Sequence, residues 1–241
     1  MRFRSGSDIG LRREENQDAV RCEYFGHNVL AVVCDGMGGE RAGREASQIA
    51  LEEFYQRFSD GYSESLDTDG IRKLMISAVS AANSVIYTKA RLDFKNFGMG
   101  TTCVAAFVTQ DKAFIANVGD SRAYLITDNG LHQITTDHNV PSLLFEQGKI
   151  TEAEIDVHPQ RHMLIRAVGV EKTVLTDTFI LDYEDKIHLL LCSDGLSGYC
   201  SDEEISDVIA ENELDGMVDQ LIKLANGKGG RDNITVALIW D

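Results

Sequence analysis

The sequence predicts an α+β protein in which antiparallel sheets are covered by helices. Short apolar runs bounded by turn residues recur along the chain and are typical of strands, whereas apolar residues at helical spacing occur in paired segments between these runs. The 241 residues contain no long linker, repeat or low-complexity tract. We therefore expect one domain over residues 1–241, with about ten strands and four substantial helices.

The first elements follow from simple patterns. Strands are predicted at 1–9, 18–25 and 28–35, with a charged loop over 10–17. The next segment has apolar residues at helical spacing and is predicted as a helix: Ala46, Ile49, Ala50, Phe54 and Phe58. A polar loop over 59–68 then leads to a longer helix over 71–92.

The middle of the chain predicts strands at 102–109, 113–118 and 123–127. A hairpin turn over 119–122 is expected between the last two, and it contains Asp120. An aspartate in a turn is usually only a turn former, and this alternative stays open for Asp120.

Residues 139–166 differ from their surroundings. Pro141 can start a short helix that Gly148 ends, and Thr151 with Glu154 forms a capping box. We interpret this segment as an insertion that forms a flap over a site, where it could select substrates.

The last part of the chain returns to strands at 172–181 and 187–192. Ser201-x-x-Glu204 caps one helix, and a second helix covers 217–225. The final apolar run follows Asp232.

Three aspartates stand at the ends of buried strands. Asp35 ends an apolar run and is followed by Gly36, Gly38 and Gly39, and Asp194 follows the run 187–192 in the same way. Asp232, in contrast, precedes its strand. Because the end of one antiparallel strand lies beside the start of its neighbour, these acids can meet at one rim. Alternatively, Asp35 caps the helix that starts near Gly43.

Several carboxylates at one rim would repel one another unless cations compensate them. Donors that are all oxygen select hard ions such as Mg²⁺ or Mn²⁺, and two such ions about 3.5 to 4 Å apart can activate a water for attack on phosphorus. Arg12 or Arg13 could hold the phosphate, although either arginine could simply be a solvated loop charge.

Composition excludes several classes of protein. The net charge of −16 argues against a nucleic-acid partner. No apolar segment reaches 18 residues and the first thirty residues carry several charges, so neither membrane insertion nor a signal peptide is expected. We expect a cytoplasmic protein. The five widely spaced cysteines predict buried free thiols, and the six scattered histidines argue against zinc.

The chain resembles bacterial members of the protein phosphatase 2C family, the metal-dependent serine/threonine protein phosphatases. The matching motifs occur in the family's order: SDIGLRREENQDA at 7–19, VCDGMGG at 33–39, GMGTT at 98–102, VGDSRAY at 118–124, TTDH at 135–138, HPQR at 158–161, RAVG at 166–169, LCSDGLS at 191–197 and GRDNITV at 230–236. The resemblance implies a four-layer α-β-β-α sandwich of two antiparallel sheets flanked by helix pairs, with a metal site at one end and a small flap at about 139–166.

The resemblance also implies roles for single residues. Asp35 would bridge two Mn²⁺ or Mg²⁺ ions, and the carbonyl of Gly36 would bind one of them. Asp194 and Asp232 would complete the shell of the other ion, and Asp18 would act through bound waters. Asp120, with Asp194, would hold a third, weaker ion. Arg13 would hold the substrate phosphate because it fits the family's D-x-G-x-x-R frame, whereas Arg12 does not.

Two departures from the family's pattern affect the mechanism. Met37 stands where animal relatives often carry a proposed general-acid histidine, which leaves a metal-bound water or His158 of the flap as candidates. Gln17 replaces a glutamate found in many relatives, so this position lends the metals less charge.

The expected function is hydrolysis of phosphoserine and phosphothreonine in proteins by a hydroxide that bridges two ions, without a covalent phosphoenzyme. The partners implied by the resemblance are a serine/threonine kinase and its phosphorylated substrates, and a monomer is expected. Two alternatives stay open: a two-metal hydrolase of small phosphate esters, and an inactive module that binds phosphoproteins. The second would require broken metal ligands, and Asp35, Asp194 and Asp232 are all present.

Overall fold

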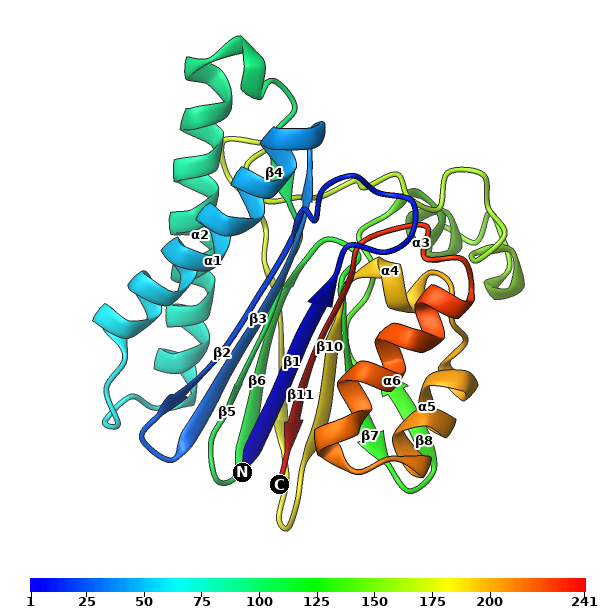
Figure 1. Cartoon of the computed structure of the whole chain (residues 1–241). Helices are drawn as coiled ribbons and strands as arrows, with labels where there is room; N and C mark the ends of the chain where they lie inside the picture. Colours follow the sequence, from blue (N-terminus) through cyan, green and yellow to red (C-terminus); the bar gives the residue numbers. More distant parts are fainter.

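The computed structural model describes the backbone of residues 1–241 and every side chain except those of Glu40 and Arg41. Two antiparallel sheets lie between a pair of helices on one side and a pair of helices on the other (Figure 1). The predicted α+β class and the four-layer order are therefore confirmed.

Each sheet combines strands that are distant in the sequence. The first sheet has the order β1 (Arg2–Asp8), β11 (Ile234–Trp240), β10 (His188–Cys192), β7 (Arg122–Thr127) and β8 (Gly130–Gln133). The second has the order β2 (Asp18–Phe25), β3 (Asn28–Met37), β5 (Cys103–Val108), β6 (Lys112–Val118) and β9 (Asp177–Asp182), and β4 (Gly100–Thr101) extends it by pairing with β3.

Helices α1 (Glu40–Gly61) and α2 (Thr68–Leu92) pack on the second sheet, and α5 (Asp202–Glu211) and α6 (Leu214–Gly227) on the first. The remaining helical turns are η1 (Phe94–Asn96), α3 (Val140–Glu146), η2 (Glu152–Glu154) and α4 (Asp194–Ser197). None of the helices formed by the described residues combines the length and apolarity needed to cross a lipid bilayer.

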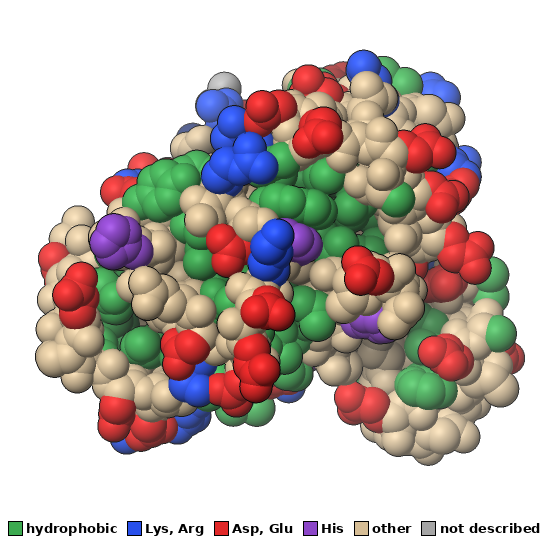
Figure 2. All heavy atoms as spheres, turned by 90° about the horizontal axis from the view of Figure 1, so that it is seen from below, with side chains coloured by type: hydrophobic (Ala, Val, Ile, Leu, Met, Phe, Trp, Pro, Cys, Tyr) green, Lys and Arg blue, Asp and Glu red, His purple; other side chains and the backbone are tan. Residues whose placement is uncertain are grey.

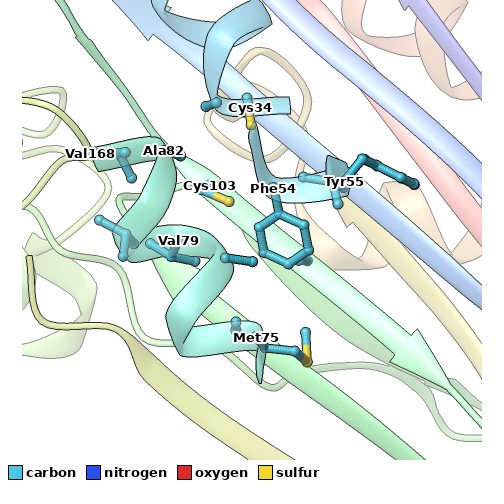
Figure 3. Close-up of a cluster of buried hydrophobic side chains, with 14 of the residues drawn as sticks. Cys34, Phe54, Tyr55, Met75, Val79, Ala82, Cys103 and Val168 are labelled. Carbon is cyan, nitrogen blue, oxygen red and sulfur yellow. The ribbon is translucent and has the colours of Figure 1, made fainter. Parts of the chain in front are cut away.

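The alternation of side chains along β3 produces two separate cores. Leu30, Val32 and Cys34 face α1 and α2, whereas Val29 and Val33 face the opposite sheet. Figure 3 shows the helix-side cluster, in which side chains from α1 and α2 pack over Cys34 and Cys103 of the two strands beneath them. The same alternation assigns Asp35, two residues beyond Val33, to the face between the sheets.

Helix ends follow local signals in the sequence. Asp67 caps α2 by accepting a hydrogen bond from the backbone N–H of Gly70, and Ser201 caps α5 within a capping box. The backbone at Gly39 precedes α1 without a side-chain cap. The alternative in which Asp35 caps this helix is therefore wrong.

The structure corrects two other expectations. The turn over 119–121 is not a hairpin, because β6 and β7 belong to different sheets and the turn carries the chain from one to the other. Residues 172–176 are not part of a strand, and β9 begins only at Asp177. The short strands β4 and β8 and the helical turn α4 were not predicted, since each is too short to show a period.

The flap has the predicted elements in reduced form. Asn139 caps α3, Pro141 stands in its first turn, and Gly148 follows its end with a positive φ of 66°. The Thr151 and Glu154 capping box is present but starts only a single turn, η2.

Candidate active site

Each sheet contributes two aspartates to the same end of the sandwich. Asp18 and Asp35 are directly opposite one another in the register of β2 and β3. Asp194 follows the end of β10, and Asp232 precedes the start of β11, which is the antiparallel neighbour of β10. The fifth acid, Asp120, lies in the turn that joins the two sheets. The rim predicted from strand ends is thus formed.

These acids border an open cleft of about 580 Å³. Asp35, Asp120, Asp194 and Asp232 line it together with the glycines that follow β3. Asp18 lies just beneath, 8% exposed, where its Oδ2 accepts a hydrogen bond from Ser193 Oγ at 2.7 Å.

Burial and mutual repulsion disfavour the charged form of the carboxyl groups. Burial is the main cause that raises the pKa of Asp18 to about 7, and the charges of Asp194 and Asp232 act in the same direction. Burial, followed by the charges of Asp18 and Asp194, raises the pKa of Asp35 well above its usual range. The pKa of Asp120 is raised well above its usual range by burial and then by Asp194.

The donor set fits hard divalent cations. All five side chains offer oxygen, and among the described side chains Asp18 Oδ1 is a buried atom without a hydrogen-bond partner. Bound cations would remove the repulsion that raises these pKa values. Within the described residues, no three acidic, histidine or cysteine side chains converge on one point, and two of the rim acids have other partners: Asp232 contacts Arg13 and Asp194 contacts His162.

Arg13 is one of these neighbours. Its Nη2 lies 2.6 Å from Asp232 Oδ2 at the mouth of the cleft, and its side chain is about half exposed. The loop that carries Arg13 is attached to β11 by Asn233, whose amide donates to the carbonyls of Ile9 and Glu15 and accepts from the N–H of Gln17. Sequence reasoning missed Asn233, although it directly follows Asp232.

The other neighbour is His162 of the flap. Its Nδ1 lies 3.1 Å from Asp194 Oδ2, and its ring packs near Tyr199 with centroids 6.1 Å apart. His158, the flap histidine considered from the sequence, does not line the cleft among the described residues. Its Nδ1 instead accepts from the N–H of Gln160. The sequence carried no signal for His162 or Tyr199, because loops of irregular backbone bring them to the cleft.

The glycines after Asp35 allow close backbone approach. A side chain at Gly36 would place its Cβ 2.0 Å from the carbonyl oxygen of Gly43, so only glycine fits between β3 and α1. Asp35 itself is fixed by its main chain. Its N–H donates to Thr102 Oγ1 at 2.9 Å, and its carbonyl accepts from the N–H of Thr102 at 2.8 Å.

A smaller cavity of about 40 Å³ lies beneath the flap, between Asp120 and Asp194. Arg122 and Asp137 line it and form a largely buried ion pair, with Nη2 to Oδ2 at 2.8 Å. This pair holds the start of β7 against the segment that leads into the flap.

The family model described as Protein phosphatase 2C matches residues 11–238. Serine/threonine phosphatase stp of Listeria welshimeri is 37% identical over 240 residues, covering 97% of this chain and 93% of the relative. Together these matches include all five rim aspartates and Arg13.

Two solved structures extend the similarity to the fold. Stp1 from Staphylococcus aureus is 36% identical, covers 99% of this chain and 94% of its own, and superposes with a TM-score of 0.92. The catalytic domain of the serine threonine protein phosphatase PstP, in complex with two manganese ions, is 33% identical with a TM-score of 0.84, and the match covers 98% and 96% of the two chains.

Proposed function

The chain belongs to the protein phosphatase 2C family of metal-dependent serine/threonine protein phosphatases, and we propose that it hydrolyses phosphoserine and phosphothreonine in proteins by direct attack of hydroxide. The observation that carries this proposal is the rim of five aspartates with an arginine at its mouth. The family's cofactor is Mn²⁺ or Mg²⁺, and two ions bound at the rim would supply the hydroxide by lowering the pKa of a water.

The chain's own residues would hold the ions and the substrate. We assign Asp35, the carbonyl of Gly36, Asp194 and Asp232 as the groups that would hold the two ions. Asp18 lies deeper, and Ser193 donates a hydrogen bond to only one of its two carboxylate oxygens, so Asp18 would act through bound water. Asp120, which shares the small cavity with Asp194, would help to hold a third ion.

Arg13 is suited to binding the phosphate. Its guanidinium can hold two phosphate oxygens in a planar fork, and its half-exposed position allows a phosphoprotein to reach it. Its present partner, Asp232, is one of the proposed ion ligands, so ion binding would free the guanidinium for the substrate.

No covalent phosphoenzyme is needed in this proposal. The four buried cysteines lie in the apolar clusters, and burial raises the thiol pKa of Cys192 to about 12 and that of Cys200 to about 11. The biological role that we propose is reversal of phosphorylation by a serine/threonine kinase, in line with the names of the relatives.

The experiment that tests the function is phosphate release from a phosphothreonine peptide, measured with Mn²⁺ and with excess chelator. We expect metal-dependent release that Asp194→Ala abolishes and that Asp185→Ala, on the exposed loop before β10, leaves unchanged. Free phosphoserine is the comparison substrate, and equal rates on it would favour a small-ester hydrolase. No release with any divalent ion would overturn the enzyme and favour a phosphoprotein-binding module.

A further inference from the structure

His138 is buried, 4% exposed, and makes hydrogen bonds through all four of its polar groups. Its backbone N–H donates to the carbonyl of Gly119 at 3.0 Å, and its carbonyl accepts from the N–H of Ile165 at 2.9 Å. Its Nδ1 lies 3.0 Å from the N–H of Gly119, and its Nε2 lies 3.1 Å from Asp177 Oδ2. The backbone and side chain of this one residue therefore join the turn between the sheets, the base of the flap and the start of β9, and the side chain itself joins the turn to β9.

These partners define the tautomer. A backbone N–H can only donate, so Nδ1 must accept and the proton of the neutral ring must be on Nε2, which donates to Asp177. Arg166 Nη1 lies 2.9 Å from Nε2, but a protonated Nε2 cannot accept a hydrogen bond. Nη1 therefore donates to Asp177 Oδ1 at 2.6 Å. Burial, assisted by the charge of Arg166, lowers the pKa of His138, which agrees with a neutral ring.

His138 hydrogen-bonds both the N–H and the carbonyl of Gly119, and the backbone of Gly119 has little conformational freedom. Its φ is +108°, and a side chain there would place its Cβ 2.5 Å from Thr102 Cγ2. Thr102 in turn shares a hydrogen bond of 2.7 Å with Ser121 and accepts from the N–H of Asp35. Asn117 Nδ2 also donates to the carbonyl of Gly119 at 3.3 Å. The residue between Gly119 and Ser121 is Asp120, so His138, Thr102 and Asn117 together position the turn that carries this acid.

We propose that His138 is a positioning residue that holds the Gly119 to Ser121 turn, and with it Asp120, in place through the hydrogen bond that Nδ1 accepts. Asp177 orients the ring from the other side, as an outer carboxylate commonly orients a histidine. This inference builds on the proposed phosphatase function, because Asp120 matters there as an ion ligand.

The test uses substitutions that separate the two ring nitrogens. His138→Asn retains an acceptor near the place of Nδ1, His138→Gln retains an amide near the place of Nε2, and His138→Ala retains neither. His188→Asn is the matched control, because this half-buried histidine stacks on Trp240 at the opposite end of the molecule. Each full-length protein is studied by calorimetric titration with Mn²⁺ and by kcat and KM on p-nitrophenyl phosphate and on a phosphothreonine peptide.

We expect His138→Ala to weaken the weakest Mn²⁺ binding step about 10-fold or more and to lower kcat about 10-fold on both substrates, the scale typical of an outer-shell partner. His138→Asn should stay within about 3-fold of the parent, His138→Gln should resemble the alanine variant, and the control should not change either readout. KM should change less than kcat.

Three results would overturn the proposal: a folded His138→Ala with an unchanged Mn²⁺ isotherm, an asparagine variant as impaired as the glutamine variant, or an effect confined to KM for the peptide. If the alanine variant does not fold, the comparison of asparagine with glutamine decides. The isotherms remain informative if the parent releases no phosphate, so failure of the proposed function is distinguishable from failure of this inference.

Discussion

The two ends of the sandwich use the same residue type in opposite ways. At the end with the cleft, Asp18 and Asp120 are buried, and this burial, together with the charge of Asp194, raises the pKa values of both carboxyl groups. At the other end, where the chain termini meet, Asp128 and Asp185 lie exposed in connecting loops. Figure 2 shows this end, where acidic side chains are scattered among apolar and basic ones around a hollowed surface.

Unfavourable negative charge is concentrated at the cleft end of the sandwich. The connecting loops at the exposed end leave the carboxylates of Asp128 and Asp185 in water, where a charge costs little free energy. At the cleft, strand ends from both sheets converge and remove water from acids that have no equal number of basic partners. Bound cations stabilise a cluster of this kind, because they compensate the repulsion between carboxylates that is present in the free protein.

Among the variants, Asp35→Asn should show the difference between the two ends most strongly. We expect phosphatase activity to fall by about three orders of magnitude, because a catalytic ion supplies several kcal/mol of transition-state stabilisation. In chelator, however, the same variant should unfold about 2 to 4 °C higher, because a repelled buried charge is removed. Activity assays and thermal melts check both signs. Asp185→Asn is the control, and equal melting temperatures for parent and Asp35→Asn would contradict the repulsion argument.

A second variant tests the apolar region between the two ends. Leu189 of β10 is fully buried between the sheets. Leu189→Ala should lower the free energy of unfolding by about 2 to 5 kcal/mol through the cavity it leaves. Urea titration measures this loss, and KM for a phosphopeptide should be unchanged in the folded variant. A large rise in KM would mean that the core and the cleft are coupled.

Arg13 tests the mouth of the cleft. Arg13→Ala should lower kcat/KM for a phosphopeptide about 10- to 100-fold, because a charge-assisted contact to phosphate is lost. Arg13→Lys should recover part of this loss, since lysine keeps the charge but not the planar fork. Arg12→Ala is the matched control from the same loop. Equal losses of kcat/KM in Arg13→Ala and Arg12→Ala would contradict the assignment of phosphate binding to Arg13.

The pH dependence of stability gives the smallest expected effect. The pKa of Asp18 is raised to about 7 in the folded protein, and an unfolded aspartate titrates near 4, so between these values the folded state binds more protons. Stability in chelator should therefore fall as the pH rises from about 5 to 7, by at most about 1.4 kcal/mol per pH unit for each such group. Melting temperatures measured with chelator and with Mn²⁺ should diverge as the pH rises. A constant difference would contradict a raised pKa.

Much of the fold could be predicted because its signals are local. The apolar run of β3, the helical spacing in α1 and α2, and the cap at Ser201 depend on neighbours a few residues apart. Predictions failed where pairing partners are remote. The chain around Asp120 looks like a hairpin by length alone, but β6 and β7 pair in different sheets. Residues 172–176 have strand-like composition, yet within this segment pairing with β6 begins only at Asp177.

Patterns along the chain are enough to identify the acids that end strands and to show that their oxygen atoms suit Mg²⁺ or Mn²⁺, and the ordered motifs are enough to identify the family. The folded structure was needed to show that Asp18 faces Asp35, that His162 rather than His158 reaches Asp194, and that His138 holds Gly119. The physical reason is that hydrogen bonds and charge repulsion act over a few ångströms in space. Residues as far apart in the chain as Arg13 and Asp232, which are separated by 219 positions, come within that range only when the two sheets close on each other.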